Sequence, residues 1–214
     1  MPDSDFYITT PRLYISHHNA SNDAHCDCFV NVIHSPSSKK YNQNGPSIVP
    51  NREAARSLIE ATTDRMQRTS YGRYIVSIRP SPEIEAENES IPFSQRKLEF
   101  IGAITMQHNR FPAVPGPLIP DLGFNFLPQY HGKGYATEAA TYLMKWFREE
   151  KGTKAFAGIT DDENVAAKKA LTRLGFRSWG MRRVKGVVDG GEERELSIWT
   201  IGVEDEGNLA GLGL

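Results

Sequence analysis

The stretch "QYHGKGYATEA" at residues 129–139 places two glycines around a lysine, immediately before a segment with helical spacing. Glycine is conformationally costly beside a helix, so Gly132 and Gly134 indicate a backbone that needs a positive φ or a close approach by another group. The preceding residues 121–127 have the pattern of a strand. A strand, a glycine-containing turn and a helix start predict an anion site, because the first N–H groups of a helix lack intrahelical partners.

Two common phosphate-binding motifs do not fit this stretch. The P-loop pattern G-x-x-x-x-G-K-[ST] requires a glycine where Leu127 stands and a hydroxyl residue where Gly134 stands. The dinucleotide-binding pattern G-x-G-x-x-G places its third glycine at Thr137. The anion site therefore belongs to another class.

The segments around this stretch predict a mixed α/β fold. Hydrophobic periodicity and turn signals indicate helices at residues 21–35, 51–68, 134–151 and 164–174. They also indicate strands at residues 6–16, 73–79, 98–107, 121–127 and 154–160, and a final pair around a turn at Asp189–Gly191. The strand–helix–strand order at 121–160 requires a parallel pair with a crossover inside a mostly antiparallel sheet. We expect the ligand near that parallel pair.

Size and composition favour one soluble domain. The chain has 214 residues, of which 39% are hydrophobic and 24% charged, with 25 basic and 26 acidic side chains. This balance gives no broad basic face for nucleic acid, and no apolar run is long enough to span a bilayer. The N-terminal segment 1–13 lacks the features of a secretory signal. We expect a single domain over 1–214, with a flexible hairpin insertion at 80–97 and a short tail at 203–214.

The two cysteines are separated by a single residue. Cys26 and Cys28 form a lone C-x-C in "HCDCF" without a second pair. Such close neighbours rarely form a disulfide bond, and a metal site needs more ligands. We interpret them as structural thiols, expect no metal, and predict a reducing, cytoplasmic location.

The glycine stretch resembles the acyl-CoA pyrophosphate loop of the GNAT superfamily of N-acetyltransferases, written [QR]-x-x-G-x-[GA]. The matching residues are His131-Gly132-Lys133-Gly134-Tyr135-Ala136. The flanking "DLGFNFLPQYHGKGYATEA" is similar to the RimJ/RimL-like branch, which acetylates the N-termini of ribosomal proteins. "DDENVAAKKALTRLGF" and "TPRLYI" resemble further segments of that branch. The resemblance covers the second half of the chain well and the first half thinly.

The resemblance implies a set of contacts to acetyl-CoA as co-substrate. The backbone of Phe126 and Leu127 would hold the pantetheine arm as an added strand. The expected pyrophosphate contacts come from His131, Gly132, Lys133, Gly134, Tyr135, Ala136 and Thr137. Asn164 would contact the cofactor arm, although it is also a natural N-cap. Lys168 would reach a ribose phosphate, although it is equally an ordinary solvated lysine.

Three residues depart from the family pattern. His131 replaces the usual Gln or Arg, which removes one side-chain contact or makes it sensitive to pH. Leu171 stands where many members carry a tyrosine that protonates the leaving thiolate, and Ala167 stands where RimL-like proteins often carry a serine. Since neither side chain can donate a proton, the general acid has no candidate.

Direct attack of an amine on the thioester needs a base, since an amine with a pKa of about 10.4 is charged at neutral pH. Asp121 is our candidate, at the head of the predicted cofactor-binding strand where relatives usually carry glutamate. Its short side chain favours a water relay, and an ordinary strand-entry residue is the alternative. We thus expect an acetyl-CoA-dependent N-acetyltransferase acting on a protein N-terminus or a small amine, as a monomer or homodimer. The alternatives are a non-catalytic acyl-CoA-binding module and, more distantly, another nucleotide-binding protein.

Overall fold

The opening segment forms a hairpin rather than the single strand expected over residues 6–16. In a computed structural model that describes residues 5–111 and 113–214, β1 (Tyr7–Thr9) pairs antiparallel with β2 (Leu13–His17). Pro11 explains the difference, because proline has no N–H for a ladder and favours a turn. Residues 1–4, at the start of the predicted non-signal segment, and Pro112, in the proline-rich loop 108–120, lie outside the described part.

Eight strands form a mixed sheet in the order β1-β2-β3-β4-β5-β6-β8-β7. The remaining strands are β3 (Gly72–Ile78), β4 (Glu99–Gln107), β5 (Asp121–Phe126), β6 (Phe156–Thr160), β7 (Arg177–Val184) and β8 (Arg194–Ile201). β5 and β6 pair in parallel, with Asp121 opposite Ala157, while β6–β8 and β7–β8 are antiparallel. The predicted mixed sheet with a parallel pair is confirmed.

The chain divides into two compact units that share strands β4 and β5. Unit 1 comprises residues 1–104 and 124–143, and unit 2 comprises residues 105–123 and 144–214. We describe each unit separately.

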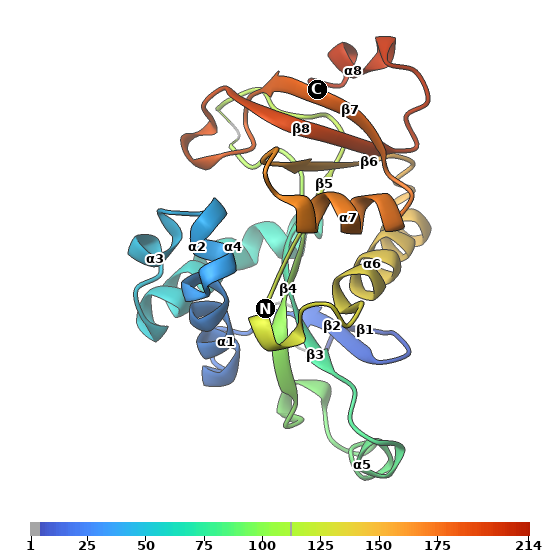
Figure 1. The fold of residues 1–214 in the computed structure, drawn as a ribbon. Coiled ribbons are helices and arrows are strands. Elements are labelled where there is room, and N and C mark those ends of the chain that lie inside the picture. The colour runs from blue at the N-terminus through green and yellow to red at the C-terminus, as the bar shows by residue number, and fades with distance from the viewer. Residues whose placement is uncertain (1–4, 112) are drawn as a thin grey trace. The chain divides into compact units, whose positions relative to one another are not determined.

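Unit 1 carries a group of N-terminal helices beside its strands (Figure 1). These are α1 (Asp23–His34), α2 (Pro36–Tyr41), α3 (Gly45–Ile48) and α4 (Arg52–Thr69). Asn22 caps α1 and Asn51 caps α4, each accepting a hydrogen bond from a first-turn N–H. One apolar cluster, which joins α1 to α4, includes Cys26, Phe29 and Ile59. Both cysteines are buried and unpaired, and burial raises the pKa of Cys28 to about 12.

The predicted insertion at 80–97 contains short helical elements within unit 1. They are α5 (Pro82–Glu87) and the 3₁₀ turn η1 (Phe93–Gln95). Glu85 accepts hydrogen bonds from Arg79 at 3.0 and 2.6 Å and a further one from Tyr14, so α5 is tied to β2 and β3. A second 3₁₀ turn, η2 (Pro128–Tyr130), precedes the glycine stretch.

Unit 2 is built on β6, β7 and β8, which lie side by side in Figure 1. Helix α6 (Tyr135–Lys151) ends in this unit at Gly152, and α7 (Val165–Arg173) packs near β6. The 3₁₀ turn η3 (Asp189–Gly191) joins β7 to β8, as predicted. The segment expected to be a plain tail contains α8 (Gly207–Gly211), whose Leu209 is buried in an apolar cluster with Ile198.

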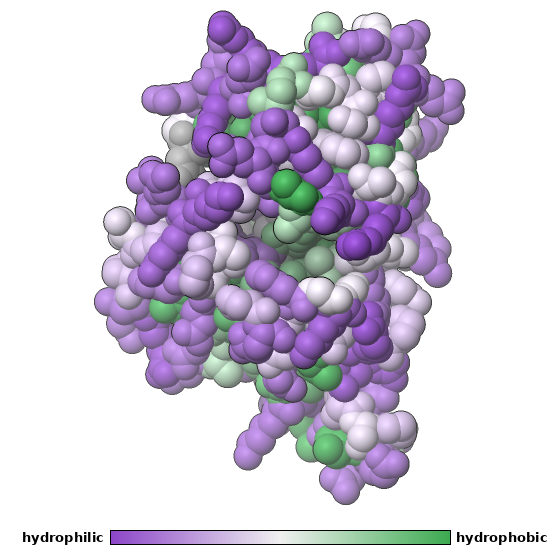
Figure 2. Space-filling view, in the orientation of Figure 1, coloured by the Kyte–Doolittle hydropathy of each residue, from purple (hydrophilic) through white to green (hydrophobic). Residues whose placement is uncertain are grey.

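The surface is mostly hydrophilic on the face seen in Figure 2, with hydrophobic residues in small separate patches. Over the described residues, no helix combines the length and apolar character needed to cross a membrane.

Candidate functional site: a glycine loop at a helix start

The glycine loop in unit 1 adopts the backbone conformation that its sequence predicts. Gly132 has φ 74° and Gly134 has φ 81°, both in the left-handed region that disfavours other residues. A Cβ at Gly132 would meet no atom within 4 Å, so the conformation and not crowding requires glycine there. Helix α6 begins directly afterwards at Tyr135. Gly134 has no side chain with which to cap the helix, and the helix dipole favours negative charge at this end.

The residues expected to hold the pantetheine arm carry several internal hydrogen bonds. The Leu127 N–H donates to the Ile101 carbonyl at 2.9 Å, and the Leu127 carbonyl accepts from the Tyr130 N–H at 2.9 Å. His131 Nε2 lies 2.8 Å from the Phe126 carbonyl, and because a carbonyl only accepts, Nε2 must carry the proton. The unusual histidine is therefore turned back onto the strand that leads into the loop.

Lys133 places a cation at the loop, with Nζ 5.3 Å from the centre of the Tyr130 ring. Tyr130 donates from its hydroxyl to Glu99 on β4, and this hydrogen bond raises the pKa of Tyr130 to about 12. The loop is thus attached to β4 through a tyrosine that stays protonated at neutral pH.

Asn164 and Lys168 lie in unit 2, at the start of α7. Asn164 Oδ1 accepts a hydrogen bond from the Ala167 N–H at 3.1 Å, so the expected N-cap is present. An amide side chain keeps two N–H donors on Nδ2 when its oxygen is used in this way. Lys168 pairs with Asp162, and three-quarters of its side chain is buried. Their contacts to a cofactor stay predictions.

Asp121 begins β5 in unit 2 and is 96% buried, since 4% of its surface is exposed. Its carboxylate forms an ion pair with Arg110, whose Nη1 also donates to the Val187 carbonyl at 2.7 Å. Burial raises the pKa of Asp121 above its usual value, and the positive charge of Arg110 opposes this shift. A carboxylate with a raised pKa is better suited to accept a proton near neutral pH than an exposed one.

Over residues 5–111 and 113–214, no cluster of three or more His, Cys, Asp or Glu side chains is arranged to hold a metal ion.

The family model described as "Acetyltransferase (GNAT) domain" matches residues 12–177 of this chain. The chain belongs to the GNAT acetyltransferase family. It is therefore an acetyltransferase, as the loop sequence and its resemblance predicted. A comparison with the curated proteins finds no match.

Solved GNAT structures share this fold at low sequence identity. A putative ribosomal-protein-serine acetyltransferase from Vibrio cholerae superposes with a TM-score of 0.67 at 17% identity, covering 92% of this chain and 98% of that one. RimL, a ribosomal L7/L12 alpha-N-protein acetyltransferase in complex with coenzyme A, superposes with a TM-score of 0.63 at 14% identity. The match covers 92% of this chain and 97% of that one. The microcin C7 self-immunity acetyltransferase MccE, in complex with acetyl-CoA and AMP, gives 0.63 at 15% identity, with 90% and 93% covered.

The two positions at which the family resemblance implies proton donors hold Leu171 and Ala167 in this chain. Leu171 is buried on α7, and its Cδ2 lies 2.5 Å from where a Cβ at Gly158 would stand. A glycine on β6 therefore lets α7 approach the strand closely. Ala167 contributes its backbone N–H to the Asn164 cap. Neither residue offers an acid, which agrees with the sequence prediction.

Two arginines beside the predicted residues escaped sequence analysis. Arg110 pairs with Asp121 from the proline-rich loop, where no periodicity indicates a contact. Arg12 contacts Glu138 and Lys133 of the glycine-loop region, 126 and 121 residues away in sequence. Pro11 was the one available signal for the turn that carries Arg12, because proline disfavours an uninterrupted strand.

Proposed function

We propose that this GNAT enzyme uses acetyl-CoA to acetylate a primary amine, either a protein N-terminus or a small-molecule amine. The observation that carries the proposal is the glycine loop, with Gly132 and Gly134 at positive φ directly before the start of α6. Backbone N–H groups at such a start bind phosphate well, because the helix dipole adds positive potential there. The solved relatives with bound coenzyme A or acetyl-CoA support the same choice of co-substrate.

The pyrophosphate is expected on the amides of residues 132–137, and the thioester arm along the backbone of Phe126 and Leu127. Because the Phe126 carbonyl already accepts from His131, an arm that uses this carbonyl has to bind at its second lone pair or displace the imidazole. Asn164 Nδ2 and Lys168 Nζ are proposed to contact the cofactor arm and a ribose phosphate, respectively.

Asp121 is proposed as the general base. The amine attacks the thioester carbon directly, the C–S bond breaks, and CoA leaves as its thiolate. The proton that the amine loses passes to the Asp121 carboxylate through a water molecule. Deprotonating an amine with a pKa of about 10.4 at neutral pH costs roughly 4–5 kcal/mol, so a positioned base matters for the rate. A base of this kind contributes about 10²–10⁴-fold. The burial that raises the pKa of Asp121 favours this role.

The test combines CoA calorimetry with thiol release from acetyl-CoA and a panel of amines. The wild type should bind CoA and release thiol with at least one amine. Asp121→Asn should lower turnover by about 10²–10⁴-fold and leave CoA affinity unchanged. It should also remove the limb at the acidic end of the pH–rate profile. Unchanged turnover would exclude Asp121 as the base.

The same experiment also tests the alternative of a non-catalytic acyl-CoA-binding module, which the lack of an acidic group at Leu171 and Ala167 would suit. Tight CoA binding with no thiol release across the amine panel would support this alternative. The absence of CoA binding at millimolar concentration would contradict both candidates.

A further inference from the structure

The tip of the β1–β2 hairpin is a rigid turn in unit 1 that presents Arg12. The Thr10 N–H donates to the Leu13 carbonyl at 2.9 Å, and the Leu13 N–H donates to Thr10 Oγ1 at 2.8 Å. Arg79, directly after β3, binds both flanks of the turn. Its N–H donates to the Arg12 carbonyl at 2.9 Å and its Nη1 to the Thr10 carbonyl at 2.8 Å. The backbone of Arg12 is therefore held in place independently of its side chain.

The Arg12 side chain reaches three residues of the glycine-loop region. Nε forms a 2.7 Å ion pair with Glu138 Oε2, and Nη1 donates to the Lys133 carbonyl at 3.0 Å. The guanidinium also lies 4.7 Å from the centre of the Tyr135 ring. The planar fork of arginine can make these contacts together, whereas the point charge of a lysine cannot.

Glu138 is the partner that fixes the orientation of this fork. Its Oε1 accepts from Thr10 Oγ1 at 2.6 Å and from the Arg12 N–H at 2.8 Å, so both carboxylate oxygens are bound by the turn. Burial would raise the pKa of Glu138, but the hydrogen bonds from Thr10 and Arg12 hold it below its ordinary value. The carboxylate is therefore charged at neutral pH and anchors Arg12 beside the loop.

The bond to the Lys133 carbonyl has a directional consequence. This carbonyl and the Gly134 N–H belong to one planar, trans peptide unit, so they point in opposite directions. With the carbonyl held by Arg12, the Gly134 N–H is directed away from the guanidinium. Gly134 forms one side of this peptide at φ 81°. Because glycine restricts φ less than other residues do, the orientation of the peptide depends on the contacts that hold it.

We propose that Arg12 is a positioning residue for the pyrophosphate site, fixing the Lys133–Gly134 peptide so that its N–H faces the ligand. The inference rests on the proposed function, because it assumes that the loop binds the pyrophosphate of CoA. It assigns a part of cofactor binding to a residue outside the loop sequence, at the tip of the N-terminal hairpin.

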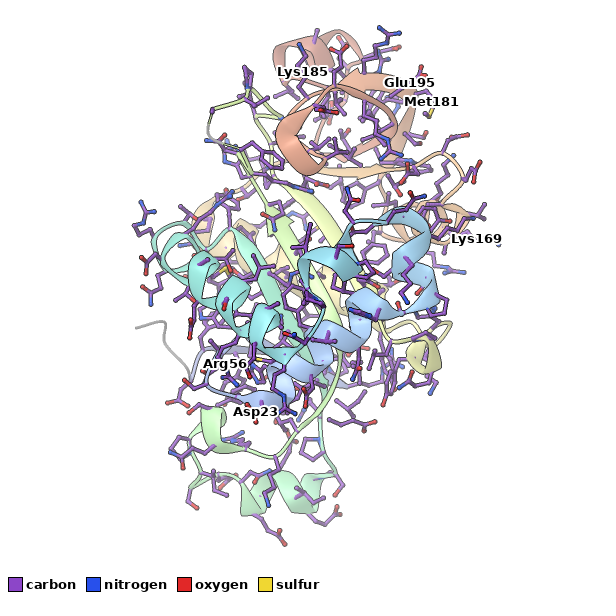
Figure 3. The ribbon with its side chains drawn as sticks, turned by 90° about the vertical axis from the view of Figure 1, so that its left-hand side faces the viewer. Asp23, Arg56, Lys169, Met181, Lys185 and Glu195 are labelled. Carbon is purple, nitrogen blue, oxygen red and sulfur yellow. The ribbon has the colours of Figure 1, made fainter. Side chains whose placement is uncertain are left out.

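Arg56 offers a matched control in the same unit. Like Arg12, it donates to a carboxylate and to a backbone carbonyl, since Nη2 donates to Asp23 Oδ1 at 2.7 Å and Nη1 to the Ala20 carbonyl. A second carboxylate, Glu53, lies 3.8 Å from its Nε. Figure 3 labels Arg56 and Asp23, which lie close to each other on the helical side of unit 1. Loss of either arginine removes the same kinds of interaction, but only Arg12 contacts the loop.

The experiment measures CoA and dephospho-CoA binding by calorimetry, and thermal unfolding without ligand, for the wild type, Arg12→Ala, Arg12→Lys and Arg56→Ala. Arg12→Ala should lower the affinity for both ligands about tenfold, because both carry the pyrophosphate. Arg12→Lys should resemble Arg12→Ala, since a single ammonium cannot replace the fork. Arg56→Ala should bind both ligands like the wild type, with a similar loss of thermal stability.

Four outcomes would overturn the inference, and one of them also removes the proposed function. If the wild type fails to bind CoA, the proposed function is wrong and this inference fails with it. If the wild type binds CoA and Arg12→Ala stays within twofold, only the positioning role is wrong. Wild-type affinity for both ligands in Arg12→Lys would show that a positive charge at this position is sufficient, without the fork of arginine. A loss confined to CoA would place Arg12 at the ribose phosphate rather than at the loop.

Discussion

Helices α6 and α7 begin in different ways, because a glycine precedes α6 and an asparagine precedes α7. Asn164 caps α7 with its own side chain, which accepts from the Ala167 N–H. Gly134 precedes α6 at φ 81° and has no side chain to use in this way. The chain therefore caps the start of α7 with a side chain, whereas the start of α6, which Gly134 cannot cap, is the one that we propose for the pyrophosphate. Glycines in a sequence do not by themselves establish a binding site. A glycine at the position of a helix cap, however, gives a physical reason to expect an anion there.

Among the variants expected to change CoA binding, Gly134→Ala should have the largest effect. A Cβ at φ 81° is strained and would lie 3.4 Å from Arg12 Nη2, so the loop should shift. We expect CoA affinity to fall about 10–100-fold, or roughly 1.4–2.8 kcal/mol by calorimetry. Gly152→Ala, at the other end of α6 with φ 63°, is the matched control. It should lose stability from the same kind of strain but retain CoA binding; equal affinity losses in both variants would remove the distinction between the two ends.

Glu138→Gln should test the charged anchor in the first turn of α6. We expect a loss of about 1–2 kcal/mol of unfolding free energy at pH 7, because hydrogen bonds to a charged group are weakened. A folded-state pKa below the usual value of 4.5 means that this stabilisation is present above pH 4.5 and is lost as the pH falls through the folded pKa. The midpoint temperature of thermal unfolding should therefore fall less steeply from pH 7 to pH 3 in the variant than in the wild type. Parallel curves would contradict a lowered pKa.

Asn164 variants should separate capping of α7 from contact with the cofactor. Asn164→Ala removes the cap and should cost about 1 kcal/mol of stability. Asn164→Ser keeps a capping oxygen but lacks the Nδ2 donors, so its stability should change by only a few tenths of a kcal/mol. If Nδ2 contacts the cofactor, both variants should weaken CoA binding about two- to tenfold. Wild-type affinity in both would leave Asn164 as a cap alone.

The smallest effect is expected from Lys168→Ala at the start of α7. Its pair with Asp162 involves a carboxylate that is 61% exposed, and such pairs contribute about 0–1 kcal/mol. The free energy of unfolding should therefore change little in this variant. If the variant binds CoA more weakly than the wild type does but binds dephospho-CoA equally well, the proposed ribose-phosphate contact is supported. If the variant binds each ligand as tightly as the wild type does, the contact is contradicted.

Local patterns predicted the parts of the fold that depend on neighbouring residues. The parallel pairing of β5 with β6 follows from a strand, a helix and a strand in succession. The positive φ of Gly132 and Gly134 follows from glycines placed before a helix. The cap at Asn164 likewise follows from its place before an apolar helix face.

Elements that depend on tertiary contacts were missed. Helices α2, α3 and α8 are six residues or fewer, too short for hydrophobic periodicity to show. The opening strand was predicted as continuous because its β-rich composition outweighed the turn signal of Pro11. The ion pair between Arg12 and Glu138 joins residues 126 positions apart, which a single sequence does not indicate.

The separation of Arg12 from Glu138 in the sequence affects when the glycine loop can reach its folded state. During synthesis the N-terminal hairpin emerges first, and its partner Glu138 follows more than a hundred residues later. Contacts between such distant residues are slow to form, because a long intervening chain must be ordered first. If Arg12 fixes the loop, a nascent chain that ends before α6 has no functional cofactor site. Removal of the first dozen residues by a protease would then inactivate a protein whose entire loop sequence is still intact.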